Sequence, residues 1–314
     1  MVPNDNNPGP GDVVGDQTTT LPHLPGPYGA AAVGGVFTAP VSTRPHTGYA
    51  YLDSVAGRRE VLALAHRGGA YHPEIEGLEN TLAAFKHAVS LGYRYLETDV
   101  HVTSDGVLLA FHDRVLDRVT DQRGEIASLT YAEVRQALVG GREAVPTLER
   151  LFEEFDDALF NIDLKADGAV AALAEFIDTH DAWDRVLVGS FSPRRLRRFR
   201  ELTQHRVPTS AHPLEVIAFR FLPSGRLADL ITRGRVAALQ VPHRRGPWPL
   251  TNRGLVRRAH AARKHVHVWT IDAAAQMHEL LDLGVDGLFT DRTDTLKDVL
   301  AERGQWMDQW RDQE

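Results

Sequence analysis

The sequence predicts a single α/β domain, a (β/α)₈ barrel of the TIM type, and three observations indicate it. From about residue 60 onward, short apolar runs alternate with segments of helical periodicity, which is typical of βαβ units around a parallel sheet. This periodic region spans roughly 240 residues, the usual size of such a barrel. Reactive side chains also end several of the apolar runs, where barrels of this class form their active sites.

Nine apolar runs have the length and composition of buried strands, one more than a barrel of eight requires. They are residues 61–65, 95–100, 108–112, 159–164, 185–189, 206–210, 236–241, 266–270 and 287–290. Only about six residues, around the turn Ser104-Asp105-Gly106, separate the second run from the third, whereas a parallel crossover needs about a dozen. We therefore expect one of these two runs to belong to a hairpin or an irregular return.

Amphipathic helices fit between the other runs. They are expected at residues 79–91, 130–138, 147–157, 168–179, 193–201, 252–263 and 273–283. The candidate start signals are Thr81, Thr130, Ser192 and Asp272, because their side chains can accept a hydrogen bond from a free amide of the first turn. Gly92 and Gly284 are the candidate stop signals, since glycine readily adopts the left-handed conformation that ends a helix.

The N-terminal segment differs in composition from the rest of the chain. Residues 1–50 hold eight of the 17 prolines and eight glycines but only four charged side chains. Such a segment buries too little apolar surface to offset its ordering entropy. We predict a poorly ordered arm at residues 1–58, a barrel domain at 59–304 and a short tail at 305–314. The alternative is that Tyr28, Phe37, Tyr49 and Tyr51 attach parts of the arm to the barrel surface.

Composition excludes several classes of protein. The net charge is −7 and the basic residues are dispersed, which argues against a nucleic-acid binder. The chain has no cysteine, so any metal must be held by oxygen or imidazole. No apolar stretch approaches the roughly 18 residues of a membrane span, and no Lys or Arg precedes Arg44 as a secretory signal would require. We therefore expect a cytoplasmic protein without an integral membrane segment, while the oligomeric state stays unknown.

Three carboxylates stand at the ends of predicted strands. Glu97 and Asp99 lie two residues apart in an extended run, so both side chains point to the same face, near the barrel mouth. Two carboxylates there repel each other unless a cation neutralises them. With Asp163 they form an all-oxygen site that suits Mg²⁺, Ca²⁺ or Mn²⁺. The alternative is that Glu97 and Asp99 form salt bridges with Arg67, Arg94 or Lys165.

Two histidines and two basic residues complete the candidate site. His66 and His112 end apolar strands, and an imidazole pKa of about 6.5 suits proton transfer near neutrality. Arg67 and Lys165 supply the positive charge that a phosphodiester needs as its oxygens gain charge in the transition state. A glycosidase needs neither a metal nor a phosphate clamp. The sequence contains neither a Gly-x-Ser-x-Gly elbow nor a Gly-x-x-x-x-Gly-Lys loop, which argues against a serine hydrolase and a P-loop nucleotidase.

Several spaced motifs, taken in order, resemble the glycerophosphodiester phosphodiesterase family of the PLC-like phosphodiesterase superfamily. The resemblance runs from about residue 61 to residue 296. The motifs are His66-Arg67-Gly68, Glu79-Asn80-Thr81, Glu97-Thr98-Asp99-Val100, Thr103-Ser104-Asp105-Gly106, His112-Asp113, Asn161-Ile162-Asp163-Leu164-Lys165, Trp269-Thr270-Ile271-Asp272 and Gly284-Val285-Asp286-Gly287-Leu288-Phe289-Thr290-Asp291. The resemblance implies a barrel enzyme that hydrolyses deacylated phospholipids to sn-glycerol 3-phosphate and an alcohol.

The resemblance also implies a role for each matching residue. His66 and His112 would be the acid/base pair, with the assignment of acid and base open. Arg67 and Lys165 would hold the phosphate. The remaining implied roles are ligands of one Mg²⁺ or Ca²⁺ ion for Glu97, Asp99 and Asp163, support of the site or of a glycerol hydroxyl for Glu79, and lining of the substrate pocket for Trp269. Whether water attacks directly, or a glycerol hydroxyl attacks first to form a cyclic phosphate, also stays open.

Three positions depart from the family pattern. Asp163 stands where Glu is usual, and its side chain is one methylene shorter, which affects the metal site. Gly77-Leu78 precede Glu79 where proline is usual, and Asp272 stands where Asn is common. Two alternative functions remain: a related lysophospholipase D-type phosphodiesterase, which would need an apolar entrance for an acyl chain, and a catalytically silent barrel used for binding.

Overall fold

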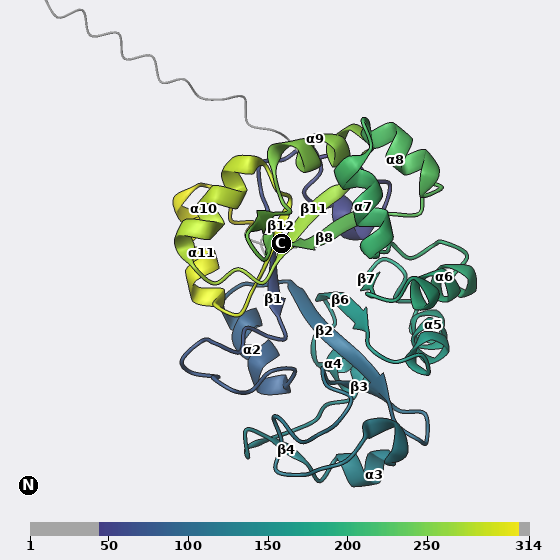
Figure 1. Cartoon of the computed structure of the whole chain (residues 1–314). Helices are drawn as coiled ribbons and strands as arrows, with labels where there is room; N and C mark the ends of the chain where they lie inside the picture. Colours follow the sequence, from purple (N-terminus) through teal and green to yellow (C-terminus); the bar gives the residue numbers. More distant parts are fainter. Residues whose placement is uncertain (1–43, 308–314) are drawn as a thin grey trace, which may run out of the picture. The chain divides into compact units, whose positions relative to one another are not determined.

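The computed structural model describes residues 44–307, and its core is a parallel sheet with helices around its outer face (Figure 1). The strand order is β7-β6-β2-β1-β12-β11-β8. The bounds are Leu62–His66 for β1, Tyr95–Val102 for β2, Leu159–Leu164 for β6, Val186–Gly189 for β7, Ala238–Pro242 for β8, His265–Trp269 for β11 and Gly287–Thr290 for β12. Every pair of neighbours in this order is parallel, as the predicted barrel requires.

The two ends of this sheet are joined through a short extended segment at residues 207–211. Val188 of β7 forms a parallel bridge with Thr209, and Ser210 forms one with Ala238 of β8. The amide of Ser210 donates to the carbonyl of Val188 at 3.0 Å, and the amide of Ala237 donates to that of Thr209 at 2.9 Å. The predicted run at 206–210 is thus the eighth member of the barrel, although it forms bridges rather than a regular strand.

The surplus apolar run forms a hairpin, as its short connection predicts. Strand β3, Leu108–Ala110, pairs antiparallel with the carboxyl-terminal part of β2, where Val102 lies opposite Leu108. Two further antiparallel pairs lie in loops. They are β4 (Leu138–Val139) with β5 (Glu143–Ala144), and β9 (Arg244–Arg245) with β10 (Trp248–Pro249).

All seven predicted helices are present. Their bounds are α2 Leu82–Ser90, α3 Tyr131–Val134, α4 Leu148–Glu154, α5 Ala169–Thr179, α6 Pro193–Leu202, α9 Arg253–Ala261 and α10 Ala274–Leu283. Thr81, Thr130 and Ser192 are the N-caps of α2, α3 and α6, and Gly284 ends α10 at φ +87°. The start signal at Asp272 is wrong, because α10 begins after Ala273 and the Asp272 carboxylate accepts the amide of Asp291 instead.

Four helices and a turn of 3₁₀ helix were not expected from the sequence. They are α1 Ala50–Asp53, η1 Ile126–Ser128, α7 Pro213–Phe221, α8 Gly225–Ile231 and α11 Thr293–Glu302. Helices α7 and α8 lack the polar outer face by which an amphipathic helix is identified. Leu214, Phe221 and Leu230 are 64, 73 and 74% exposed on them, so apolar residues occur on both faces.

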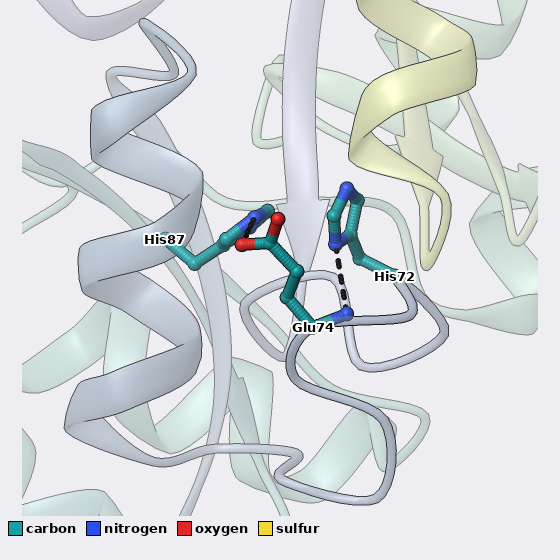
Figure 2. A group of neighbouring side chains, drawn as sticks. All are labelled: His72, Glu74 and His87. Carbon is teal, nitrogen blue, oxygen red and sulfur yellow. Dashed lines mark hydrogen bonds and ion pairs between the residues drawn. The ribbon is translucent and has the colours of Figure 1, made fainter.

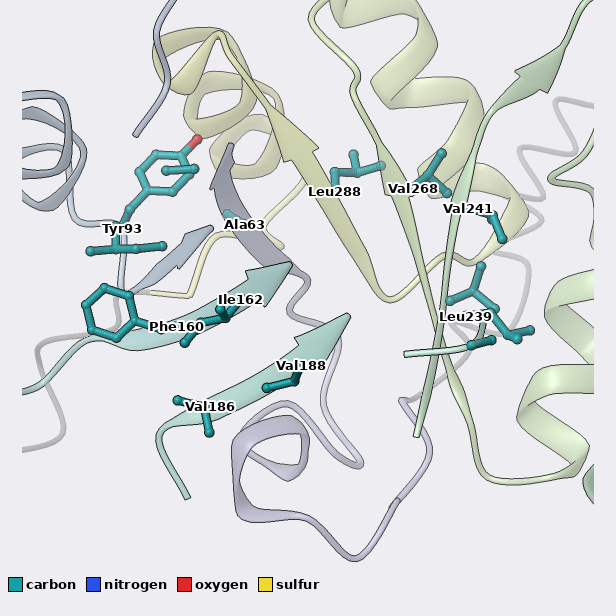
Figure 3. Packing of buried hydrophobic residues seen from close by; sticks show 14 of the residues in the cluster. Ala63, Tyr93, Phe160, Ile162, Val186, Val188, Leu239, Val241, Val268 and Leu288 are labelled. Atoms are coloured by element: carbon teal, nitrogen blue, oxygen red, sulfur yellow. The ribbon is translucent and has the colours of Figure 1, made fainter. Parts of the chain in front are cut away.

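Alternate residues of the strands pack against the helices and form the main core. Ala63, Ile162, Val188, Val268 and Leu288 belong to this layer, each from a different strand (Figure 3). The other residues of the strands face the barrel interior. Its amino-terminal half is apolar and contains Leu62, Leu64, Tyr95, Leu159 and Leu187. The carboxylates of the strands, Glu97, Asp99 and Asp163, lie in the opposite, carboxyl-terminal half.

Helix α1 packs against the amino-terminal end of the barrel interior. Tyr51 and Leu52 are buried in the same cluster as Leu62, and the Tyr51 ring meets Tyr95 edge to face at 5.2 Å. Residues 44–58 therefore differ from the poorly ordered arm that composition predicts, because three apolar residues of this segment, among them Val55, reach the barrel core. Residues 1–43 lie outside the described part of the chain, and so do two of the four aromatic residues considered as attachment points.

The carboxyl-terminal boundary also differs from the prediction. Residues 305–307 continue beyond α11, and the ring of Trp306 meets that of Tyr93 edge to face at 5.2 Å. The amide of Val61 donates to the carbonyl of Gln305 at 3.2 Å. These three residues therefore belong to the barrel domain. Among the helices of residues 44–307, none is sufficiently long and apolar to span a membrane.

Asp286 ties the N-terminal segment to the barrel, and replacing it with asparagine is expected to destabilise the fold. Its buried carboxylate accepts the His260 Nε2–H at 2.8 Å and the Val266 amide at 2.7 Å, and lies 3.5 Å from Arg44 Nη1. Removing one partner of a buried ion pair leaves the other uncompensated, so we expect Asp286→Asn to lower the free energy of unfolding by roughly 3 kcal/mol. Equal stabilities in denaturant at pH 7 would contradict this.

The effect of Asp286→Asn should depend on pH. Burial on its own raises the pKa of Asp286, but the hydrogen bond from His260 and the charges of His265, His260 and Arg44 lower it to about 2. Because this value lies below the ordinary 3.8, the carboxylate stabilises the fold above pH 4 and loses that effect as the pH falls toward 2. We expect the difference in unfolding free energy between wild type and variant to be smaller at pH 3 than at pH 7.

Candidate active site

The carboxyl ends of β1, β2 and β6 bring the predicted site residues to one edge of the sheet. In the parallel register, His66 of β1 pairs with Glu97 of β2, and Asp99 of β2 pairs with Asp163 of β6. Paired residues of parallel strands share a face, and so do residues two apart on one strand. Glu97 and Asp99 accordingly follow Tyr95 along the interior face, one and two steps beyond the apolar layer.

Lys165 and Arg67 lie among the three carboxylates. Lys165 Nζ is 3.0 Å from Asp99 Oδ1 and 2.7 Å from Asp163 Oδ2. Arg67 Nε is 3.1 Å from Asp99 Oδ2, in an ion pair whose geometry is unsuited to a hydrogen bond, and the Arg67 amide donates to Glu97 Oε2 at 3.0 Å. The salt-bridge alternative therefore describes Asp99, which both cations contact. The three carboxylates of Glu97, Asp99 and Asp163 nevertheless have only two cationic side chains, Lys165 and Arg67, among them in these contacts.

The shortage of positive charge is visible in the pKa of Glu97. Burial, and then repulsion from Asp99, raise the pKa of Glu97 to about 7. Burial also acts to raise the pKa of Asp99, but the charges of Lys165 and Arg67 outweigh it and hold that pKa below its ordinary value. The two carboxylates thus differ in their readiness to take up a proton, and Glu97 is the one whose negative charge lacks compensation.

His66 is held by a carboxylate from the far end of the sequence. Its Nδ1 atom lies 2.9 Å from Asp291 Oδ1, just beyond the end of β12, and its Nε2 atom lies 3.9 Å from Glu97 Oε2. Burial acts to lower the pKa of His66, but the carboxylates of Glu97 and Asp291 outweigh it, so the pKa is raised. A carboxylate on Nδ1 orients the ring and presents Nε2 to the site, as a proton-transfer group requires.

His112 has a carboxylate partner of its own. His112 Nδ1 lies 2.5 Å from Asp113 Oδ1, and Arg118 contacts both Asp113 and Glu79. Glu79 also accepts from Arg67 Nη1 at 3.1 Å, so an unbroken chain of ionic contacts connects His112 to the first strand. The hydrogen bond from Arg118, and then that with His112, lower the pKa of Asp113 to about 2. Asp113 therefore keeps a negative charge beside the His112 ring.

Trp269 contributes to an aromatic wall at the same end of the barrel. It ends β11, and its ring meets that of Phe191 edge to face, with centroids 5.7 Å apart. Phe191 follows β7 and is 60% exposed. Trp269 is thus placed at the mouth, with an exposed apolar surface beside it.

The residues present fit a hard divalent cation. All three acidic groups at the mouth offer oxygen, the donor that Mg²⁺ and Ca²⁺ prefer. Asp163 Oδ1 is buried and has no hydrogen-bond partner, so a donor atom is free to bind. The three carboxylates do not converge to within 4.8 Å, however. Among residues 44–307, the group with three ligand atoms that close to one another is His72, Glu74 and His87.

Four residues of this site were given no role from the sequence. Asp291 and Asp113 position the two imidazoles, Arg118 joins Asp113 to Glu79, and Asn80 Nδ2 donates to Asp99 Oδ2 at 3.1 Å. Asp291 follows an apolar run, so the rule that selects polar residues at strand ends could have identified it. Arg118 lies in a loop after β3, where no periodic pattern indicates its place.

Replacing Asp291 with asparagine is expected to slow the reaction and to move its pH profile. Residues that orient a catalytic or metal-binding histidine typically contribute about 10- to 100-fold, so we expect kcat/KM to fall by that amount. Because Asp291 raises the pKa of His66, its loss should move the limb that reports His66 to lower pH, whether His66 acts as acid or as base. A parallel loss of activity at every pH would contradict the positioning role.

Comparisons with known proteins identify the family of this chain. Residues 66–295 match the model of the glycerophosphoryl diester phosphodiesterase family. A probable glycerophosphodiester phosphodiesterase 2 of Mycobacterium tuberculosis is 41% identical over 248 residues, which cover 78% of this chain and 92% of that protein. Human lysophospholipase D GDPD1 is 27% identical, with 76% and 85% covered.

A solved structure has the same fold. It is a phosphodiesterase of Oleispira antarctica in complex with the product sn-glycerol 3-phosphate, which is 25% identical with a TM-score of 0.64 and covers 76% of this chain and 96% of that one. The barrel fold and the resemblance identified from the motifs are confirmed. The chain belongs to the glycerophosphoryl diester phosphodiesterase family and is a phosphoric diester hydrolase.

Proposed function

We propose that this enzyme hydrolyses glycerophosphodiesters to sn-glycerol 3-phosphate and an alcohol by proton transfer between two histidines and the substrate. One observation carries the proposal: at the barrel mouth, His66 and His112 each have an aspartate on Nδ1, so both rings are oriented with Nε2 available. The sn-glycerol 3-phosphate bound to the Oleispira antarctica enzyme supports the identity of the product. We also propose a cytoplasmic location, as composition suggests.

In this mechanism one imidazole takes the proton of the attacking hydroxyl, which belongs to water or to the glycerol. If the glycerol hydroxyl attacks, a cyclic phosphate forms first, and water must then open it to give sn-glycerol 3-phosphate. The other imidazole donates a proton to the alcohol oxygen as its bond to phosphorus breaks. The first imidazole thus gains one proton and the second loses one, so the number of protons on the enzyme is unchanged. Arg67 and Lys165 would turn from their carboxylate partners to the phosphate oxygens, and Glu79, which already contacts two arginines, would hold a glycerol hydroxyl or keep Arg67 in place.

Glu97, Asp99 and Asp163 would hold one divalent cation, Mg²⁺ or Ca²⁺, with Mn²⁺ also suited to these donors. Such a cation, when bound, polarises the phosphate oxygens and stabilises their charge. For the protein itself, binding requires Lys165 to leave Asp163 and Glu97 to remain ionised. The buried Oδ1 of Asp163 and the raised pKa of Glu97 both indicate that added positive charge would be stabilising.

The test is the release of glycerol 3-phosphate from glycerophosphocholine, with and without a chelator. We expect turnover that is lost on chelation and restored by Mg²⁺, Ca²⁺ or Mn²⁺. Loss of turnover by at least about 100-fold is expected, because a cation at a developing phosphate charge contributes several kcal/mol. Full activity in chelator would contradict the cation site, and absence of product under all conditions would contradict the proposed substrate.

A second candidate function is lysophospholipase D activity, and the exposed Phe191 beside Trp269 favours it. An acyl chain needs an apolar surface next to the phosphate site, and the name of the human relative points the same way. The rates on glycerophosphocholine and lysophosphatidylcholine distinguish the two functions. If lysophospholipid is the substrate, Phe191→Ser should reduce its kcat/KM much more than that of glycerophosphocholine. Equal effects would count against an acyl contact.

A further inference from the structure

A second group of metal-binding side chains lies outside the catalytic cluster. His72 and Glu74 belong to the loop between β1 and α2, and His87 lies in the last turn of α2. Figure 2 shows the Glu74 carboxylate directed toward His87, with His72 on the other side. One ligand atom from each residue lies within 4.8 Å of the other two. We call these three residues the loop cluster.

The separations in the loop cluster are close to those of a tetrahedral metal site. His87 Nε2 lies 3.4 Å from Glu74 Oε2, and metal bonds of about 2.1 Å place two ligands of a tetrahedral ion about 3.4 Å apart. The imidazole rings of His72 and His87 have centroids 4.0 Å apart, so the third ligand is also near. The three ligand atoms lie within 4.8 Å of one another, so side-chain rotations have only a short distance to cover in closing the site.

The present contacts of these side chains are weak. His87 Nε2, the atom that faces Glu74, forms only a 3.4 Å ion pair with its carboxylate, and no hydrogen bond fixes the other ring nitrogen, Nδ1. His72 Nδ1 accepts only a long 3.3 Å hydrogen bond from the Glu74 amide. The Glu74 side chain is 75% exposed, so an ion in solution can reach it. Two imidazoles and a carboxylate are thus close together without strong partners of their own.

The chemistry of these donors selects a different ion from the one at the barrel mouth. Imidazole nitrogen suits Zn²⁺ and other late transition metals, whereas the all-oxygen group of Glu97, Asp99 and Asp163 suits Mg²⁺ or Ca²⁺. Three protein ligands and one water would complete the four-coordinate shell that Zn²⁺ prefers. None of the loop-cluster residues contacts the three carboxylates through a hydrogen bond or ion pair within residues 44–307.

We propose that the loop cluster is a Zn²⁺ site, separate from the catalytic cation, that fastens the loop at residues 68–78 to helix α2. This loop begins after Arg67 and ends at Glu79, and the amide of Tyr71 within it donates to the carbonyl of Asp291 at 3.1 Å. Zinc at the loop cluster would therefore stabilise the segment that joins Arg67 to Glu79 and contacts Asp291. The proposal concerns binding and stability, and it does not depend on the substrate.

The test is zinc binding to the full chain, measured after chelator treatment by equilibrium dialysis or calorimetry with zinc chloride. Excess Mg²⁺ in the buffer occupies the oxygen donors at the barrel mouth. It leaves the loop cluster free for Zn²⁺, because Mg²⁺ competes poorly for imidazole. We expect wild type to bind one Zn²⁺ ion at this site. The affinity of the double variant His72→Ala/His87→Ala for Zn²⁺ should be on the order of 100-fold lower, or undetectable. Zinc at 100 times its Kd should raise the Tm of wild type by about 5 °C, and that of the variant much less.

Two further variants complete the design. Glu74→Gln changes an exposed side chain without changing its size, so it tests the site even if the double variant fails to fold; we expect zinc to bind on the order of 10-fold more weakly. His278→Ala is the matched control, because His278 lies 3.8 Å from Glu302 in a similar exposed pair without a second histidine. Zinc binding that is equal in wild type and Glu74→Gln, or lost equally in His278→Ala, would overturn the proposal. The cluster would then contribute only the ion pair between His87 and Glu74 and would not bind zinc.

Discussion

Asp99→Asn is expected to reduce kcat/KM for glycerophosphocholine by about 10³-fold, or roughly 4 kcal/mol of transition-state stabilisation. Asp99 is 1% exposed and is the carboxylate that both Lys165 and Arg67 contact. Its loss removes a proposed cation ligand and the ionic partner of two phosphate-binding groups at once. Asparagine has the same shape and still accepts from Asn80 Nδ2, and loss of the Asp99 charge also removes its repulsion of Glu97, which leaves Glu97 to balance the two cations, so the fold should be retained.

The matched control for this prediction is Asp167→Asn. Asp167 lies two residues beyond Lys165 and pairs with Arg195, but its side chain is 70% exposed. It should keep kcat/KM within about twofold, because exposed ion pairs contribute little. Steady-state kinetics at saturating Mg²⁺, with circular dichroism to verify folding, give both values. An Asp99→Asn enzyme as active as the control would disprove the central role of Asp99.

The second large effect is expected for the two histidines. Removing a general acid or base typically lowers kcat by about 10²- to 10⁴-fold, and we expect this for His66→Ala and for His112→Ala. The imidazole of His180, at the end of α5, donates its Nδ1–H to the carbonyl of Phe176 and stacks on the Phe176 ring, so His180→Ala is the control and should be unaffected. Two alanine variants with near wild-type kcat would contradict the proposed acid/base pair.

The same variants can assign acid and base. A glycerophosphodiester with a nitrophenol leaving group needs no general acid, because nitrophenolate leaves without a proton. The variant that lacks the acid should regain much of its rate on this substrate, whereas the variant that lacks the base should not. The comparison is made as the ratio of kcat on the nitrophenyl substrate to kcat on glycerophosphocholine. If neither ratio rises, proton donation to the leaving group is not the role of either histidine.

The sequence was sufficient for the predictions that depend on local pattern. The alternation of apolar runs and helical segments predicted the barrel, and the short connection at Ser104 predicted the hairpin of β3. The position of Glu97, Asp99 and Asp163 near the carboxyl ends of their strands was sufficient to predict that they lie at one edge of the sheet. The reason is that all barrel strands run in the same direction. Caps such as Thr81 were also predicted, since a cap acts within its own first turn.

Local pattern failed where a segment depends on distant partners. Residues 44–58 have the composition of a loose arm, yet Tyr51 and Leu52 are buried because the open end of the barrel offers them an apolar surface. Asp272 has the character of a helix cap, but the Asp291 amide binds its carboxylate and the helix begins one residue later. In each case a tertiary contact outweighs the local preference.

By itself, the sequence determined the barrel, its family and the edge at which chemistry can occur, because strand period, the length of connections and the order of motifs are visible along the chain. Only the tertiary structure decided which charges are partners. His66 and Asp291 are 225 positions apart, and Arg118 reaches Glu79 from a loop without periodicity. Closure of the sheet brings β1 beside β12, and electrostatic contacts that span the chain in this way have no signal in the local spacing of residues.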